Sequence, residues 1–180
     1  LTVDYMDIVQ RNLGMLTVEE QDWLRSKHVL IAGVGGIGAP VAIALARMGV
    51  GELTVVDFDT YEASNLNRQL PATTADIGRS KVQVVADHLE AIQPHATIHR
   101  VDGALCAANA DDLVGPADLV VGAIDGVATI TLQRALKRNA TLGITAGVAR
   151  DQIMLGSFRP GGIYLSDHYP YEVDEDDMPG

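Results

Sequence analysis

Apolar runs alternate with amphipathic segments along most of this chain of 180 residues. A short, continuous apolar run predicts a strand buried on both faces, and apolar positions three and four residues apart predict a helix packed on one side. Together they predict an α/β fold of three layers, with a mostly parallel sheet and helices on both faces. The expected strands are 29–32, 53–56, 97–101, 118–123 and 142–145, and the expected helices are 17–24, a segment from a glycine-rich turn to about residue 48, 80–92 and 128–139.

The two ends of the chain differ from this alternating pattern. Segments 154–159 and 163–165 flank a Pro-Gly-Gly turn and predict an antiparallel hairpin at one edge of the sheet. Residues 1–26 form a helical preface, in which we expect Tyr5 and Trp23 to anchor the helices. The last residues, 167–180, are an acidic tail, and we expect the natural chain to continue beyond it.

Composition narrows the class of function. Acidic residues outnumber basic ones by 24 to 13, a formal net charge of −11, which argues against nucleic acid as a partner because phosphate contacts need a basic surface. The single cysteine, Cys106, excludes paired CxxC motifs, so we expect no zinc in this chain. The sequence lacks an apolar run of the roughly 18–20 residues needed to span a membrane and shows no signal peptide, so we expect a cytoplasmic protein without membrane contact.

The strongest motif is GVGGIG at 33–38, which follows an expected strand and opens an expected helix. Gly33 permits the tight turn, Gly35 lets the backbone approach a phosphate, and Gly38 lets the helix pack closely on the sheet. Asp57 stands at the end of the next strand, where a carboxylate accepts hydrogen bonds from ribose hydroxyls. These features predict a Rossmann-like nucleotide site and fit NAD and ATP equally well.

The segment after Asp57 favours ATP. Residues 57–69 are polar, and Arg68, Arg79 and Lys81 bring three cations within fourteen residues of an otherwise acidic chain. A triphosphate carries roughly four negative charges, which Arg68 and Lys81 would offset. An NAD site needs little positive charge beyond its glycine-rich turn.

Four segments together resemble the ThiF/MoeB/ubiquitin-activating superfamily of adenylyltransferases: GVGGIG, LARMGVG at 45–51, DFDTYEASNLNRQ at 57–69 and GRSK at 78–81. Their order and spacing match over roughly residues 7–160. The resemblance implies an ATP-binding adenylation domain at 27–166 that uses ATP and Mg2+ to adenylate a carboxylate and releases pyrophosphate. Most members act on the C-terminal glycine of a ubiquitin-like or sulfur-carrier protein, and some act on peptides or small carboxylates.

The resemblance also implies roles for individual residues. Arg68 and Lys81 would be catalytic, together with Asp125, which would hold magnesium. Arg11 would be catalytic by reaching into the site of a partner subunit, which implies a homodimer. Gly126 departs from the pattern, because members of the superfamily usually carry asparagine after the metal-binding aspartate. The residues that would bind the nucleotide are Gly33, Gly35, Gly36, Gly38, Asp57, Asp59, Asn65, Arg68, Gln69 and Lys81.

Two other functions stay open at this point. The chain could be a nucleotide-binding module without catalysis in a larger protein or assembly. An NAD-dependent oxidoreductase fits less well, because the sequence offers no acid–base group for hydride transfer and SNLNRQ at 64–69 would be unexplained. We do not expect Cys106 to form a thioester, since its small apolar neighbours are typical of a buried structural thiol.

Overall fold

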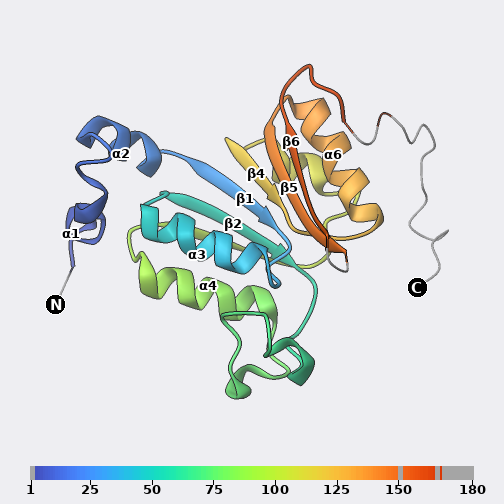
Figure 1. The fold of residues 1–180 in the computed structure, drawn as a ribbon, viewed down its shortest axis with the longest axis horizontal. Coiled ribbons are helices and arrows are strands. Elements are labelled where there is room, and N and C mark those ends of the chain that lie inside the picture. The colour runs from blue at the N-terminus through green and yellow to red at the C-terminus, as the bar shows by residue number, and fades with distance from the viewer. Residues whose placement is uncertain (1–2, 150–151, 165–166, 168–180) are drawn as a thin grey trace.

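A six-stranded sheet organises the part of the chain that the structure describes, which is residues 3–149, 152–164 and 167 of a computed structural model (Figure 1). The strands are β1 (His28–Ala32), β2 (Glu52–Asp57), β3 (Thr97–Asp102), β4 (Leu119–Gly122), β5 (Leu142–Ala149) and β6 (Gln152–Phe158). Their order in the sheet is β3-β2-β1-β4-β5-β6. The first five strands are parallel and β6 is antiparallel at the edge, so the predicted fold class is confirmed.

Helices cover both faces of the sheet (Figure 1) and leave apolar side chains of the β5–β6 edge exposed. They are α1 (Tyr5–Val9), α2 (Val18–Arg25), α3 (Gly38–Met48), α4 (Lys81–Ile92), α5 (Ala110–Val114) and α6 (Val127–Asn139), with 3-10 turns η1 (Gln10–Asn12), η2 (Ala63–Asn65) and η3 (Thr74–Asp76). None of those in the described part of the chain is long and apolar enough to cross a membrane.

Strand β1 shows why the core has two halves. Val29 and Ile31 belong to the core shared with α3 and α4, whereas Leu30 and Ala32 belong to the core shared with α5 and α6. Successive strand residues point to opposite faces, so a strand covered on both sides needs apolar residues at every position. The continuous apolar runs of the sequence therefore predict the three layers directly.

The N-terminal helices pack at the C-terminal end of α3. The buried Tyr5 donates a hydrogen bond from its hydroxyl to the carbonyl of Gly49 at 2.7 Å. Gln21, also buried, donates to the Tyr5 hydroxyl and to the carbonyl of Met48. The preface is thus anchored at the amino ends of the strands, on the left in Figure 1.

Two expectations about single side chains are wrong. Trp23 does not anchor the preface: it is 60% exposed, and the ammonium of Lys27 lies 4.7 Å from its ring centroid. Gln21 takes the buried position instead, where its amide donates a hydrogen bond to the Met48 carbonyl at the end of α3. Cys106 is only partly buried.

The edge hairpin also differs from the predicted one. β6 pairs with β5, from Gly143 opposite Phe158 to Ala149 opposite Gln152, and not with segment 163–165. Ile163 and Tyr164 lie outside any strand, and Leu165 lies outside the described residues. Tyr164 is buried and stacks on Phe158 with ring centroids 5.3 Å apart, so the apolar pattern of this segment reflects core packing. The predicted acidic tail lies outside the described residues, except Asp167.

The face of β5 and β6 opposite to α6 is apolar and exposed. Its large side chains include those of Ile144, Val148, Ile153 and Leu155, which are between 43% and 76% exposed. Residues opposite one another in an antiparallel pair share a face, so these four form one patch, the β5–β6 apolar face. Contiguous exposed apolar patches mark contact surfaces.

Candidate active site

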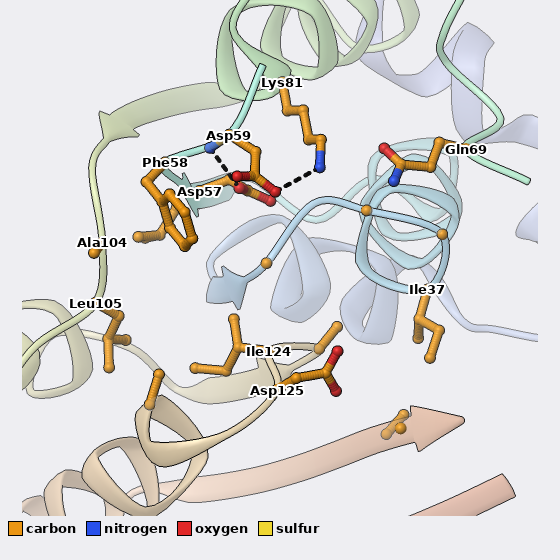
Figure 2. A pocket seen from close by; sticks show the side chains of 18 of the residues that line it. Ile37, Asp57, Phe58, Asp59, Gln69, Lys81, Ala104, Leu105, Ile124 and Asp125 are labelled. Carbon is orange, nitrogen blue, oxygen red and sulfur yellow. Dashed lines mark hydrogen bonds and ion pairs between the residues drawn. The ribbon is translucent and has the colours of Figure 1, made fainter. Parts of the chain in front are cut away.

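A cavity of about 690 Å³ opens at the carboxyl ends of the parallel strands (Figure 2). Its walls are the glycine-rich turn after β1, the loop after β2, the start of α4, the loops after β3 and β4, and part of β5. Strand order reverses here, between β1 and β4, which is the point where α/β sheets of this kind bind ligands. Ten of the predicted site residues line the cavity: Gly33, Gly35, Gly36, Asp57, Asp59, Asn65, Arg68, Gln69, Lys81 and Asp125.

Two glycines of the turn are required by the backbone itself. Gly33 has a φ of +85°, and a Cβ on it would collide with the carbonyl oxygen of Ala123. A Cβ on Gly38 would collide with the carbonyl oxygen of Gly33, so only glycine lets α3 begin this close to the turn. Gly38 therefore serves packing and does not line the cavity.

Gly35 and Gly36 are not required by the fold. Neither has a positive φ, and the atoms nearest to an added Cβ would be 3.7 Å and 3.6 Å away, an ordinary contact distance. Both line the cavity, so the space that a side chain would fill is cavity space. Glycine at these positions fits a ligand that approaches the backbone closely, as a phosphate does at the start of a helix.

Alanine should therefore lower stability at a glycine that the backbone requires and weaken ATP binding at a glycine that lines the cavity. We expect Gly38→Ala to lower the free energy of unfolding by about 3 kcal/mol, because the new Cβ meets a backbone carbonyl. We expect Gly36→Ala to change stability by no more than about 0.5 kcal/mol and to weaken ATP binding at least about tenfold. Urea unfolding and calorimetric titration measure the two effects. Equal losses of stability in the two variants would contradict this division of roles.

Asp57 ties the turn to the loop after β2. Its Oδ2 accepts a hydrogen bond from the backbone N–H of Val34 at 2.8 Å, and its Oδ1 accepts one from the N–H of Asp59 at 3.0 Å. Each carboxylate oxygen keeps a second lone pair. Asp57 thus holds the turn in shape and can still accept hydrogen bonds from ribose hydroxyls.

The loop after Asp57 is held against the start of α4 by backbone hydrogen bonds of 2.8–3.0 Å. They run from Tyr61 N–H to the Arg79 carbonyl, from Gly78 N–H to the Tyr61 carbonyl, and from Lys81 N–H to the Asp59 carbonyl. This pairing brings Lys81, the first residue of α4, into the cavity wall. Its Nζ donates to Oδ2 of Asp59 at 2.8 Å (Figure 2).

Tyr61 belongs to this loop, and its side chain is buried, at 1% exposed. Its hydroxyl has no hydrogen-bond partner among the residues that the structure describes. We expect Tyr61→Phe to raise the free energy of unfolding by about 1 kcal/mol, because it removes an unsatisfied buried polar group.

Tyr61→Phe should also change how the free energy of unfolding depends on pH in the alkaline range. Burial, with smaller contributions from Asp57 and Asp76, raises the pKa of Tyr61 from 10.0 to about 12. The unfolded chain therefore ionises first, and the contribution of Tyr61 is complete below pH 10 and lost as the pH rises towards 12. Between pH 9 and pH 11 the parent chain should lose about 1.3 kcal/mol more than Tyr61→Phe in urea unfolding. Parallel pH profiles for the two chains would exclude this effect.

Arg68 and Asn65 come from the SNLNRQ segment. The Arg68 guanidinium donates to the carbonyl of Ser64 at 2.9 Å and to the side-chain oxygen of Asn67 at 3.0 Å, so both acceptors are neutral. Its positive charge therefore stays available to the cavity. Asn65 is buried, and its Oδ1 accepts from the N–H of Glu62 at 3.1 Å, which fixes turn η2.

Gln69 faces the glycine-rich turn from the same segment. Its side chain is buried, and its Nε2 is the nearest atom to a Cβ built on Gly35. Its Oε1 has no hydrogen-bond partner among the described residues. Buried amides are normally paired, so this one is typical of a site whose ligand supplies the partner.

Asp125 lies in the loop after β4, on the opposite side of the glycine-rich turn from Lys81 in Figure 2. Its exposed carboxylate has no hydrogen-bond or ion-pair partner among the described residues. The next residue, Gly126, has φ +68° and ψ −146° and precedes the first turn of α6. Glycine adopts this backbone conformation and other residues avoid it. Gly126 thus provides the backbone conformation from which α6 begins.

The ionisable side chains that line the cavity are Arg68 and Lys81 against Asp57, Asp59 and Asp125, a net formal charge of −1. A triphosphate with roughly four negative charges would be repelled by this lining unless a cation came with it. Asp59 and Asp125 offer the hard oxygen ligands that magnesium prefers, and magnesium often binds through one or two carboxylates plus phosphates. The cavity therefore fits magnesium together with a nucleotide. Among the described residues, no group of three or more His, Cys, Asp or Glu side chains could hold a metal ion alone.

Sequence reasoning missed the apolar wall of the cavity. Phe58, Leu105 and Ile124 form this wall together with the backbone of Gly103 and Ala104 (Figure 2). Phe58 is 69% exposed, and an exposed aromatic ring offers a flat face for stacking a base. A single aromatic within the polar DFD segment does not by itself indicate a stacking role. Leu105 and Ile124 follow strands distant in sequence, and only the fold brings them together.

Arg11 lies away from the cavity of its own chain. In the same 3-10 turn, Asn12 donates from Nδ2 to the carbonyl of Met48 at 3.1 Å, at the C-terminal end of α3. The cavity lies at the N-terminal end of α3, which has 11 residues and is therefore about 16 Å long. A role for Arg11 thus requires the cavity of a second chain.

A second hollow of about 470 Å³, the β6 groove, continues from the cavity. It is mostly apolar and shares Ile124, Asp125, Ala146 and Gly147 with the cavity. Its remaining walls are Gly126, Thr129, Ile130, Gln133, Thr145, Met154, Leu155, Gly156 and Phe158. The two hollows meet at Asp125, so the groove connects the cavity to the edge of the sheet.

A doubly wound sheet with a glycine cradle and a ribose-side carboxylate at its switch point defines a nucleotide-binding α/β domain. The profile of the ThiF family matches residues 9–162, and the chain belongs to this family. The family predicted from the motifs is thereby confirmed.

Relatives within the family carry more than one activity. The tRNA threonylcarbamoyladenosine dehydratase of Haemophilus influenzae is 40% identical over 131 residues, which are 72% of this chain and 50% of that protein. The molybdopterin-synthase adenylyltransferase of Escherichia coli is 36% identical over 144 residues, 78% of this chain and 58% of that one. The crystal structure of E. coli tRNA N6-threonylcarbamoyladenosine dehydratase, TcdA, has a TM-score of 0.78 at 28% identity, covering 83% of this chain and 63% of that chain. The chain thus spans about half the length of these curated relatives.

Proposed function

We propose that this domain binds ATP with magnesium and transfers AMP to a carboxylate, releasing pyrophosphate. The observation that carries the proposal is the meeting of three features in one cavity. These are the open Cβ positions of Gly35 and Gly36, the cations of Arg68 and Lys81, and the carboxylate of Asp125, which has no partner among the described residues. NAD could bind at the glycine positions, but it would leave the two cations and the Asp125 carboxylate without a role. Relatives named as adenylyltransferases support the same chemistry.

Adenylation needs no nucleophile from the protein. An oxygen of the substrate carboxylate attacks the α-phosphorus, and the bond from that phosphorus to the bridging oxygen of pyrophosphate breaks. Both reactants are anions, so the barrier is mainly electrostatic and positional. Arg68 and Lys81 place positive charge beside the phosphates, and Asp57 fixes the ribose. Magnesium, when bound, would supply further charge neutralisation for the leaving pyrophosphate, with Asp125 as its protein ligand.

The β6 groove is the path that we propose for the carboxylate. Asp125 is the only charged residue among those described that line it, so the groove suits an extended, uncharged C-terminal tail. Leu155 belongs both to the groove and to the β5–β6 apolar face, which would receive the folded part of the same partner. A small carrier protein of the ubiquitin-like or sulfur-carrier type has this combination of tail and body. The relatives include a sulfur carrier protein adenylyltransferase of Thermus thermophilus.

A homodimer is part of the proposal, because Arg11 has no access to its own cavity. We expect Arg11→Ala and Arg68→Ala to be nearly inactive alone and to regain activity when mixed. If equal amounts of the two variants pair at random, about one quarter of all sites in the mixture would combine an intact Arg68 with an intact Arg11 from the other chain. The measurement is pyrophosphate exchange after co-refolding or prolonged mixing. Arg47→Ala, an exposed arginine on α3, is the control and should keep full activity. Activity of the mixture no higher than the mean of the two variants would contradict the shared site.

Exchange of labelled pyrophosphate into ATP tests the proposed function. The probes are a purified sulfur-carrier protein, a synthetic peptide ending in glycine, and a panel of small carboxylates. We expect label in ATP only when magnesium and one of these carboxylates are both present. Tight ATP binding without exchange for any probe would indicate a nucleotide-binding module without catalysis. Tighter binding of NAD than of ATP would overturn the proposal.

A further inference from the structure

Asp59 holds Lys81 at two points. The Asp59 backbone carbonyl accepts the Lys81 N–H at 3.0 Å, and the Asp59 carboxylate accepts the Lys81 ammonium at 2.8 Å. The Lys81 side chain is 8% exposed, whereas that of Asp59 is 48% exposed. The ammonium is therefore withdrawn from water and paired, while the carboxylate stays open to the cavity (Figure 2).

This ion pair lowers the positive charge that the cavity presents to a nucleotide. Of the two cations among the described lining residues, Arg68 bonds only neutral acceptors in this structure, and Lys81 is neutralised by Asp59. A triphosphate that arrives without a metal meets the exposed charge of Asp59 and has to compete with it for Lys81. A carboxylate near phosphates is unfavourable unless a cation lies between them.

We propose that Asp59 restrains Lys81 until a divalent cation accompanies the nucleotide, so that tight ATP binding depends on the metal. A metal carried by the phosphates offers Asp59 a replacement for the ammonium, and Lys81 can then turn its Nζ to a phosphate oxygen. The backbone bond between Asp59 and Lys81 fixes the start of α4, so only the side chains move. The inference rests on the proposed function, because it assumes ATP as the ligand of this cavity.

A double-mutant cycle in ATP binding tests the restraint without any carboxylate substrate. ATP is titrated calorimetrically in EDTA and in magnesium into the parent chain, Asp59→Asn, Lys81→Met and the double variant. We expect Asp59→Asn to tighten metal-free ATP binding about tenfold when Lys81 is present and less than about threefold in the Lys81→Met background. The gain on adding magnesium should shrink in Asp59→Asn, because Lys81 is then free from the start.

Asp125→Asn is the matched control, because it removes the same charge from the same cavity without touching Lys81. Its effect on metal-free ATP binding should be the same with Lys81 or Met at position 81. Equal gains from Asp59→Asn in both backgrounds would show simple repulsion and overturn the restraint while leaving the proposed function in place. Absence of ATP binding to every chain, even with magnesium, would overturn both.

Discussion

Asp125→Asn should lower magnesium-dependent pyrophosphate exchange at least about 100-fold, because it removes the carboxylate that faces the metal beside the phosphates. The fold should be unchanged, since the substitution is isosteric and Asp125 makes no hydrogen bond or ion pair with the described residues. ATP binding should weaken much less than exchange, because the glycine-rich turn, Asp57 and Arg68 still hold the nucleotide. Exchange assays and calorimetric titration on the same preparation measure the two effects.

Asp112→Asn provides the comparison for this loss. Asp112 is exposed on α5, outside the cavity, and its substitution removes one negative charge from the same domain. This variant should keep exchange within about twofold of the parent chain, as is usual for surface substitutions. An Asp125→Asn chain with near-normal exchange would place the metal elsewhere.

Lys81→Met should slow exchange about 100- to 1,000-fold, the usual effect of removing one preorganised charge from a transition state. Methionine keeps the aliphatic length of the buried side chain and removes the ammonium, so packing at the start of α4 should be kept. The loss should lie mainly in the rate at saturating ATP and leave the magnesium dependence of that rate intact, in contrast to Asp125→Asn.

Arg79→Met controls for cations next to the site. Arg79 stands two residues before Lys81 but pairs with Asp76 and Asp87 and does not line the cavity. Its substitution should change stability more than exchange. A similar loss of exchange in Lys81→Met and Arg79→Met would mean that general charge, and not a phosphate contact by Lys81, drives the reaction.

Most of the fold could be predicted because a strand that is buried on both faces has a continuous apolar sequence. Strand β1 is apolar at four consecutive positions, and α3 ends at Gly49, whose φ of +88° suits the end of a helix. The edge hairpin was mispredicted because its first strand continues beyond residue 145 through Ala146 and Gly147, which carry no strand pattern. Segment 163–165 has an apolar pattern like that of a strand because Tyr164 packs in the core.

The site could be predicted in its parts but not in its arrangement. Glycine spacing and the DFD and SNLNRQ segments indicated a nucleotide and its cations, since a glycine-rich turn between a strand and a helix commonly binds phosphate. The ion pair between Asp59 and Lys81 depends on backbone pairing between two loops, which leaves no periodic pattern in sequence. A stacking role for the exposed ring of Phe58 could not be predicted, because a single aromatic in a polar segment is not a signal by itself.

The central claim is that a carboxylate oxygen attacks the α-phosphorus of ATP in this cavity. The most direct measurement uses a sulfur-carrier protein labelled with 18O at its C-terminal carboxylate, incubated with the domain, ATP, magnesium and hydroxylamine to release the nucleotide. Attack at the α-phosphorus leaves one carboxylate oxygen on phosphorus, so hydroxylamine cleavage at the carbonyl should yield AMP that carries one 18O in the mass spectrum. Label in inorganic phosphate together with ADP would mean attack at the γ-phosphorus and would contradict adenylation.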